Sequence, residues 1–216
     1  ASCLVGSEMC IRDSFDIKSY RLSSDVDLNI FDNNFDYQDI RLMVSDMDST
    51  LIKVETIDEV AKEVGLKDEI SLITEEAMQG HLDFTESFKK RLSILKGINN
   101  SICESVYSRK VELSPGAEEL INYFKSNQIK MAVVSGGLKF FAEKLTSQLG
   151  IENCRANNVE IINQSITGNI IGNVIDAKEK AKYIGELCDQ YKLKETQVIA
   201  IGDGANDIEM MKIAGL

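Results

Sequence analysis

Residues 42–50 read Leu-Met-Val-Ser-Asp-Met-Asp-Ser-Thr, a short apolar run that ends in two carboxylates two positions apart. Open α/β sheets keep their chemistry at the carboxyl ends of buried strands. Asp46 is therefore a candidate nucleophile, and Asp48 is a candidate acid and base. Taken alone, an Asp-x-Asp pair after a strand is more often a loop cap or a metal contact, so other segments must decide between these interpretations.

Apolar strands and amphipathic helices alternate along the chain from residue 42 onward. The apolar runs predict strands at 41–45, 130–134 and 197–201, and the helical periodicity predicts helices at 117–126, 138–149 and 178–191. This alternation is typical of an α/β fold in which crossover helices connect the strands of a parallel sheet.

Two segments interrupt the alternation. Between residues 52 and 113 helical spacing replaces the strand signal, which predicts an inserted helical cap. Thr56 and Glu59 have the spacing of a capping box at the start of its first helix. Residues 157–175 alternate in polarity around turn residues at 163–169, which predicts a β-hairpin flap.

The first residues carry no fold signal. Residues 1–14 resemble a translated sequencing adapter, so we interpret them as non-native and exclude them. Residues 15–39 are rich in Asp and Asn without a sustained period, which is typical of a linker or of the tail of a missing N-terminal domain.

The amino-acid composition of the chain argues against two classes of binding partner. The formal net charge of -11 argues against nucleic acid or an anionic membrane, and no apolar run approaches the roughly 20 residues of a membrane span. The five cysteines are odd in number and lack Cys-x-x-Cys spacing, which indicates reduced thiols and a cytoplasmic location. The oligomeric state stays open, with a homodimer as one option.

Ser135-Gly136-Gly137 follows a predicted strand and precedes a predicted helix. A hydroxyl and free backbone N–H groups at a helix N-terminus form a ready site for a phosphate, and glycine lets the anion approach the backbone. An ordinary βα turn is the alternative interpretation of this segment alone.

Lys180 lies in a charged run, Lys178-Glu179-Lys180-Ala181-Lys182, for which a solvated face is the usual interpretation. At about 100° per residue, however, Lys180 aligns with Ile184, Leu187 and Tyr191 in the apolar stripe of its helix. A buried ammonium is costly unless it is paired, so we expect a partner such as Asp46 or a phosphate. Snorkelling at the helix end is the alternative.

Gly202-Asp203-Gly204-Ala205-Asn206-Asp207 ends the last predicted strand. Two carboxylates and an amide on a glycine-rich turn suit Mg²⁺, which prefers oxygen ligands and keeps water positions open for a phosphate. The cation would also relieve the repulsion among Asp46, Asp203 and a dianionic phosphate. An acidic turn with helix caps is the alternative, and it fits Asp207 better than Asp203.

Together these four segments resemble the motifs of haloacid dehalogenase-type phosphatases, and within that superfamily they are most similar to the phosphoserine phosphatases. The resemblance implies a Rossmann-like core formed by residues 40–51 and 114–216, a helical cap formed by 52–113, and an aspartyl-phosphate intermediate. It further implies that Asp46, the carbonyl of Asp48 and Asp203 hold Mg²⁺ with support from Asp207. The implied phosphate contacts are Ser135, Gly136, Lys180 and Asn206.

Substrate selection is expected in the cap, where the positions of this family that bind serine match Glu55, Met78, Phe84 and Arg91. Arg91 shares a helical stripe with Phe84, which independently suggests a desolvated carboxylate partner, either of the substrate or of a structural acid. Glu55 is suited to receive an ammonium. These features predict hydrolysis of O-phospho-L-serine, the last step of serine biosynthesis.

Two other interpretations remain open. One is the same chemistry, as hydrolysis or phosphoryl transfer, on another small phosphomonoester. The other is a non-catalytic phosphoacceptor domain, which explains Asp46 and Lys180 but leaves Asp48 and Arg91 without a role.

The sequence departs from the family pattern at two places. Ser45 precedes the predicted nucleophile where the family usually has an apolar residue, which puts local packing in question. The chain also stops at Leu216, soon after the last motif, whereas family members continue with another strand and helix. We therefore expect C-terminal edge elements to be missing and the last strand to expose hydrogen-bonding groups.

Overall fold

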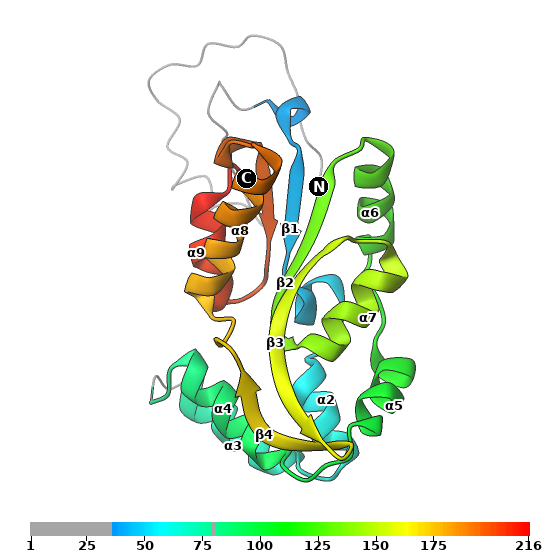
Figure 1. The fold of residues 1–216 in the computed structure, drawn as a ribbon, viewed down its shortest axis with the longest axis vertical. Helices are drawn as coiled ribbons and strands as arrows, with labels where there is room; N and C mark the ends of the chain where they lie inside the picture. The colour runs from blue at the N-terminus through cyan, green and yellow to red at the C-terminus, as the bar shows by residue number, and fades with distance from the viewer. Residues whose placement is uncertain (1–35, 79–80) are drawn as a thin grey trace, which may run out of the picture. The chain divides into compact units, whose positions relative to one another are not determined.

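The computed structural model describes residues 36–78 and 81–216 (Figure 1). Within these residues five strands form one sheet in the order β4-β3-β2-β1-β5. Neighbouring strands are parallel, except that β3 and β4 are antiparallel. This arrangement confirms the predicted α/β fold, and the predictions for residues 1–35 lie outside the described residues. The strands are β1 (Leu42–Ser45), β2 (Lys130–Leu138), β3 (Asn153–Ile162), β4 (Ser165–Ile171) and β5 (Val198–Ile201).

Helices cover both faces of this sheet. The helices α6 (Ala117–Ser126) and α7 (Lys139–Leu149) lie on one face, and α8 (Ala177–Tyr191) and α9 (Ile208–Ile213) lie on the other (Figure 1). Successive side chains of β1 point to opposite faces of the sheet. Met43 therefore packs into the hydrophobic core beneath α6 and α7, and Val44 packs into the core beneath α8 and α9. Because both faces are covered, every residue of β1 is buried, which explains its continuous apolar run.

Parallel pairing brings three strand ends to one edge of the sheet. Ser45 pairs with Val133 of β2 and with Ile201 of β5, and the backbone N–H of Asp46 donates to Ile201 O at 2.8 Å. Ser135 still lies inside β2, whose pairing with β3 shifts register between Val134 and Leu138. The segments around Asp46, Ser135 and Gly202 lie side by side. A short turn, η4 (Ala205–Asp207), connects the last of these segments to α9.

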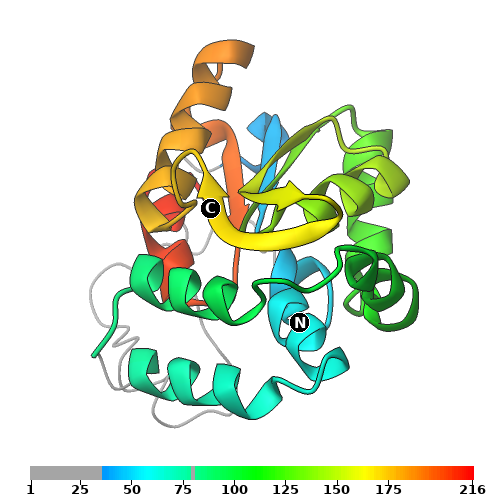
Figure 2. The same cartoon turned by 60° about the horizontal axis from the view of Figure 1, so that its bottom comes forward.

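Four helices form the cap between β1 and α6, and Figures 1 and 2 show them gathered beyond the end of the sheet at which β1 finishes. The segments that enter and leave this cap lie side by side, since Ile52 and Leu113 form an isolated bridge and Ser114 N donates to Leu51 O at 2.9 Å. The helices are α2 (Thr56–Glu63), α3 (Lys67–Met78), α4 (Phe84–Ile94) and α5 (Ser101–Lys110).

The predicted capping box of Thr56 and Glu59 is wrong. The N-cap of α2 is Glu55, and Thr56 is the first helical residue. Its hydroxyl donates instead to Asp48 Oδ2 at 3.1 Å, because the fold brings the start of α2 against the acidic loop after β1. A tertiary contact therefore replaces the local one that the spacing suggested.

The predicted hairpin is present as β3 and β4. Asn163 and Gln164 form its turn, and both have positive φ (51° and 64°), as a two-residue type I′ turn requires. The hairpin is tied to the cap by backbone hydrogen bonds, because Gly97 N donates to Ile166 O at 2.8 Å and Ile166 N donates to Ile98 O at 2.9 Å. Cap and hairpin therefore support one another.

Residues at the end of the described chain pair along the outer edge of β5. Ala200 N donates to Leu216 O at 2.8 Å, and Gly215 N donates to Val198 O at 3.0 Å. These two groups of β5 are thus hydrogen-bonded, although the sequence suggested that they would be exposed. Ser45 is also satisfied, since its buried hydroxyl donates to Asp46 O at 2.7 Å.

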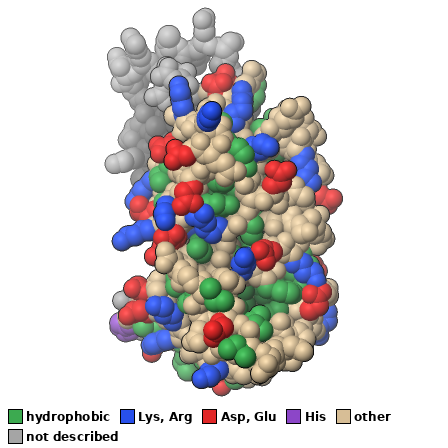
Figure 3. Space-filling view, in the orientation of Figure 1, with side chains coloured by type: hydrophobic (Ala, Val, Ile, Leu, Met, Phe, Trp, Pro, Cys, Tyr) green, Lys and Arg blue, Asp and Glu red, His purple; other side chains and the backbone are tan. Residues whose placement is uncertain are grey.

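Charged side chains of both signs are interspersed on the face shown in Figure 3. Within the described residues, no helix is long and apolar enough to cross a membrane.

The contact between α7 and α5 should carry much of the stability of the core. Phe141 of α7 is fully buried, and its ring stacks on Tyr107 of α5 with the ring centroids 6.4 Å apart. We expect Phe141→Ala to lower the free energy of unfolding by about 3–5 kcal/mol in urea titrations. Leu72→Ala, at a side chain 64% exposed on α3, is the control and should change it by less than about 0.5 kcal/mol. Equal effects of the two variants would contradict this account.

Candidate active site

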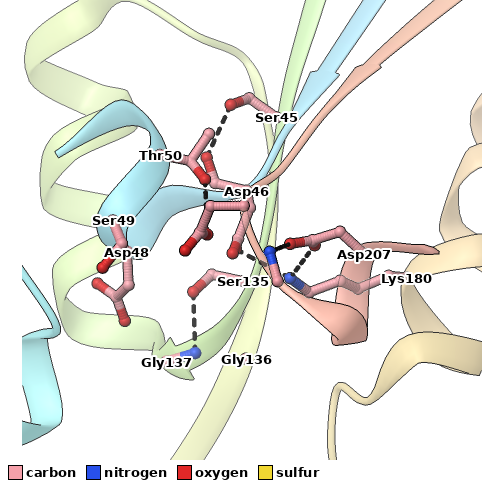
Figure 4. Close-up of polar contacts among 12 residues, drawn as sticks. Ser45, Asp46, Asp48, Ser49, Thr50, Ser135, Gly136, Gly137, Lys180 and Asp207 are labelled. Carbon is pink, nitrogen blue, oxygen red and sulfur yellow. Dashed lines mark hydrogen bonds and ion pairs between the residues drawn. The ribbon is translucent and has the colours of Figure 1, made fainter. Parts of the chain in front are cut away.

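Asp46 lies directly after β1 and is 4% exposed (Figure 4). The turn η2 (Met47–Leu51) follows it, and within this turn Asp48 (ψ 135°) and Ser49 (φ 56°) depart from helical geometry. This kink brings the Asp48 carboxylate back beside the end of β2, where a Cβ on Gly137 would meet Asp48 Oδ2. The two acids therefore lie next to the same strand end.

Lys180 is fully buried and joins two carboxylates. Its Nζ lies 2.9 Å from Asp46 Oδ1 and 2.7 Å from Asp207 Oδ1 (Figure 4). The expectation that a buried partner such as Asp46 accounts for this lysine is confirmed, and snorkelling is excluded. Asp207 is a second partner that the helical periodicity of α8 did not indicate, because it lies beyond a different strand.

Burial shifts the acid–base properties of both candidate catalytic acids. It raises the pKa of Asp46 from 3.8 to about 6, against the ammonium of Lys180, which lowers it. Burial also raises the pKa of Asp48 well above its usual value, and the carboxylates of Glu55 and Asp46 add to the rise. Asp48 is therefore suited to carry a proton, since Asp48 Oδ1 is buried without a hydrogen-bond partner among the described residues.

Three carboxylates converge as a metal site would require. Oxygens of Asp46, Asp203 and Asp207 all lie within 4.8 Å of one another. Asp203 Oδ1 accepts a hydrogen bond from Thr50 Oγ1 at 2.9 Å, which fixes the carboxylate of this otherwise exposed residue. Asp207 already binds Lys180 through Oδ1 and accepts from Gly204 N through Oδ2 at 3.1 Å. Asp46 and Asp203 therefore have the freer oxygens for an ion.

The candidate phosphate loop lies at the end of β2, immediately before α7. Ser135 is buried, and its hydroxyl accepts from Gly137 N at 2.8 Å. Gly136 O accepts from Asn157 Nδ2 at 2.8 Å, and Asn157 Oδ1 accepts from Ile175 N at 2.8 Å. Asn157 was missed from the sequence, because only the fold shows that this polar residue of β3 is fully buried.

A cavity of about 910 Å³ unites the predicted residues of core and cap. Phe84 of α4 reaches across it, since a Cβ on Gly136 would lie 2.5 Å from Phe84 Cζ. Lys180 is behind its wall, and Met78 ends α3 with a side chain outside the described part of the chain. The predicted site residues that line the cavity are Asp46, Asp48, Glu55, Phe84, Arg91, Ser135, Gly136, Asp203 and Asn206.

Two charged residues of the cap region, Glu55 and Arg91, also line this cavity. Glu55 Oε1 accepts from Ser49 Oγ at 2.7 Å, and burial raises the pKa of Glu55. Arg91 of α4 has a side chain only 14% exposed, with Nη1 3.8 Å from Asp58 Oδ1. Asp58 was not singled out from the sequence, because nothing local to α2 shows that it faces Arg91.

Comparison with known proteins agrees with this arrangement. The family model for haloacid dehalogenase-like hydrolases matches residues 40–215. The chain belongs to this hydrolase family. It is 45% identical to the phosphoserine phosphatase of Archaeoglobus fulgidus, over 82% of this chain and 51% of that protein, so it spans about half the length of that relative. It is 39% identical to the phosphoserine phosphatase of Polaromonas sp. (strain JS666), over 88% of this chain and 82% of that protein.

A solved structure of a phosphoserine phosphatase also matches. It is a phospho-aspartyl intermediate analogue with a TM-score of 0.76 and 37% identity, covering 82% of this chain and 84% of that one. The strand order and the two insertions of this hydrolase family member thus have a close structural counterpart.

The raised pKa of Asp46 predicts that this site destabilises the metal-free protein. The pKa of Asp46 is about 6 in the folded protein, whereas its ordinary value is 3.8. The free energy of unfolding therefore falls as the pH rises from about 4 to about 6. Asn does not titrate, so Asp46→Asn should raise the free energy of unfolding by about 3 kcal/mol above pH 6, and the gain should shrink toward zero near pH 4.

Urea titrations in a chelating buffer across this range would measure the gain. Asp189→Asn, which removes an exposed carboxylate from α8, is the matched control variant. A gain for Asp46→Asn of equal size at pH 4 and pH 7 would contradict the assigned pKa.

Proposed function

We propose that this protein is an Mg²⁺-dependent phosphatase that hydrolyses O-phospho-L-serine to L-serine and phosphate through an aspartyl-phosphate on Asp46. One observation carries the proposal. The Asp46 carboxylate, which is paired with buried Lys180, lines the same cavity as Glu55 and Arg91. Groups suited to a phosphoryl group and groups suited to an amino acid thus share one cavity.

The residues support a two-step reaction. In the first step Asp46 attacks phosphorus, the bond from phosphorus to the serine oxygen breaks, and Asp48 gives its proton to that oxygen. In the second step Asp48 takes a proton from water, which attacks phosphorus, and Asp46 is released with inorganic phosphate. The raised pKa of Asp48 supports this double role, because the acid must be protonated before the first step.

The donor set fits Mg²⁺, since Asp46 and Asp203 offer carboxylate oxygens close together. We propose these two side chains and the carbonyl of Asp48 as ligands, with Asp207 holding the site through Lys180 and Gly204. The bound ion would neutralise charge that develops on the phosphoryl oxygens. Ser135, the backbone of Gly136, Lys180 and Asn206 would bind the remaining phosphoryl oxygens.

Recognition of the amino acid follows from the charges of the cap. Glu55 would accept the substrate ammonium, and Arg91 would donate to its carboxylate. Phe84, which reaches across the cavity, would close it over the substrate. We place the reaction in the cytoplasm as the last step of serine biosynthesis. The free thiols Cys103, Cys154 and Cys188 support a reducing compartment.

Asp46→Asn should lower phosphate release from O-phospho-L-serine by at least about 1000-fold, because the covalent step is lost. Chelation of Mg²⁺ should abolish release by the unchanged protein, and Asp189→Asn is the matched control. Undiminished release by Asp46→Asn would refute the covalent mechanism. Equal rates on an aryl phosphate would refute the amino-acid substrate, and a long-lived aspartyl-phosphate without turnover would indicate a phosphoacceptor domain instead.

Gly137→Ala should lower kcat by about 100-fold, because the new methyl group would displace the Asp48 carboxylate from its position. Gly185→Ala on α8 is the matched control, since its added methyl group meets nothing within 4 Å. We expect it to keep full activity. A normal kcat for Gly137→Ala would show that the position of Asp48 does not limit the reaction.

A further inference from the structure

Arg91 and Asp58 form an ion pair without a hydrogen bond. The distance of 3.8 Å between Arg91 Nη1 and Asp58 Oδ1 is too long for a hydrogen bond but short enough for strong Coulomb attraction. Arg91 Nε and Asp58 Oδ1 are both buried and have no hydrogen-bond partner among the described residues. Buried polar atoms are normally satisfied, so this gap needs an explanation.

The placement of the two groups offers one. Arg91 lines the active-site cavity, whereas Asp58 lies outside its lining, one helical turn after Glu55. Asp58 therefore compensates the charge of the guanidinium from outside the cavity lining and leaves the hydrogen-bond donors of Arg91 unoccupied. A closer, bidentate pair would occupy the same donors that a substrate carboxylate needs.

Glu55 makes this arrangement necessary. Glu55 lines the same cavity as Arg91; burial raises the pKa of Glu55, and the charge of Arg91 lowers it. Without Asp58, Glu55 is a carboxylate toward which the partly buried guanidinium would be drawn. Such a pair would join the two charges that should bind separate groups of an amino acid.

Resting on the proposed function, we propose that Asp58 is a positioning residue that sets the selectivity of the site for substrates bearing a carboxylate. It holds Arg91 away from Glu55 and keeps its donors free for the ligand. Asp58 itself does not touch the substrate. Its effect is therefore confined to the recognition of the carboxylate and leaves the chemical step unchanged.

Phosphoethanolamine provides the test, since it is O-phosphoserine without the carboxylate. We expect Asp58→Asn to raise KM for O-phospho-L-serine about tenfold, which corresponds to the loss of one charge-assisted contact. The kcat for this substrate should change by less than about twofold. The KM for phosphoethanolamine should not change. In an Arg91→Ala background, Asp58→Asn should have no further effect. Glu63→Gln is the matched control, because it removes from α2 an acid that pairs with Arg109 instead.

Equal losses on both substrates, or additive losses with Arg91→Ala, would overturn the inference and indicate a merely structural role for Asp58. Unchanged KM values would also overturn it. Calorimetry in an Asp46→Asn background measures the same selectivity as dissociation constants without turnover. A parent protein that binds both ligands equally refutes phosphoserine as the substrate, whereas a preference that survives Asp58→Asn refutes only the role of Asp58.

Discussion

The structure of this site depends on one buried ammonium between two buried carboxylates. Lys180 comes from α8, Asp46 from the end of β1 and Asp207 from the turn after β5. Removing Lys180 would leave two buried carboxylates without their cation. The same helix presents Ile184 and Leu187 to the core that it covers. Docking α8 on the sheet and assembling the charge cluster are therefore a single event.

The charge cluster carries an excess of negative charge, and this excess gives the site its chemical character. Burial and, to a lesser extent, the charge of Asp207 keep the pKa of Asp46 raised despite its ion pair with Lys180. Asp203 adds a third carboxylate nearby. A site of this kind stores unfavourable electrostatics that a bound cation relieves. Its residues are arranged for the ligand and the reaction, at some cost in the stability of the free protein.

Periodicity explains which features could be predicted from the sequence. The parallel strands, the hairpin and the burial of Lys180 follow from local spacing, and the structure has all three. The second partner of Lys180, the bonds of Asn157 and the contact of Asp58 with Arg91 join segments that are distant along the chain. No local pattern encodes such contacts. Thr56 shows best where prediction from local spacing stops. Its spacing to Glu59 is that of a capping box, but its hydroxyl forms a tertiary hydrogen bond to Asp48 instead.

That hydrogen bond also connects the two tasks of the site. The core supplies the charge cluster, and the cap supplies the groups that suit an amino acid. Thr56, which bonds the candidate general acid, directly follows Glu55, which is placed to receive the ammonium, and both lie at the start of α2. Under the proposed function, a substrate ammonium on Glu55 would bind next to the residue whose hydroxyl bonds Asp48. Recognition of the amino group and alignment of the proton donor would then depend on two adjacent residues.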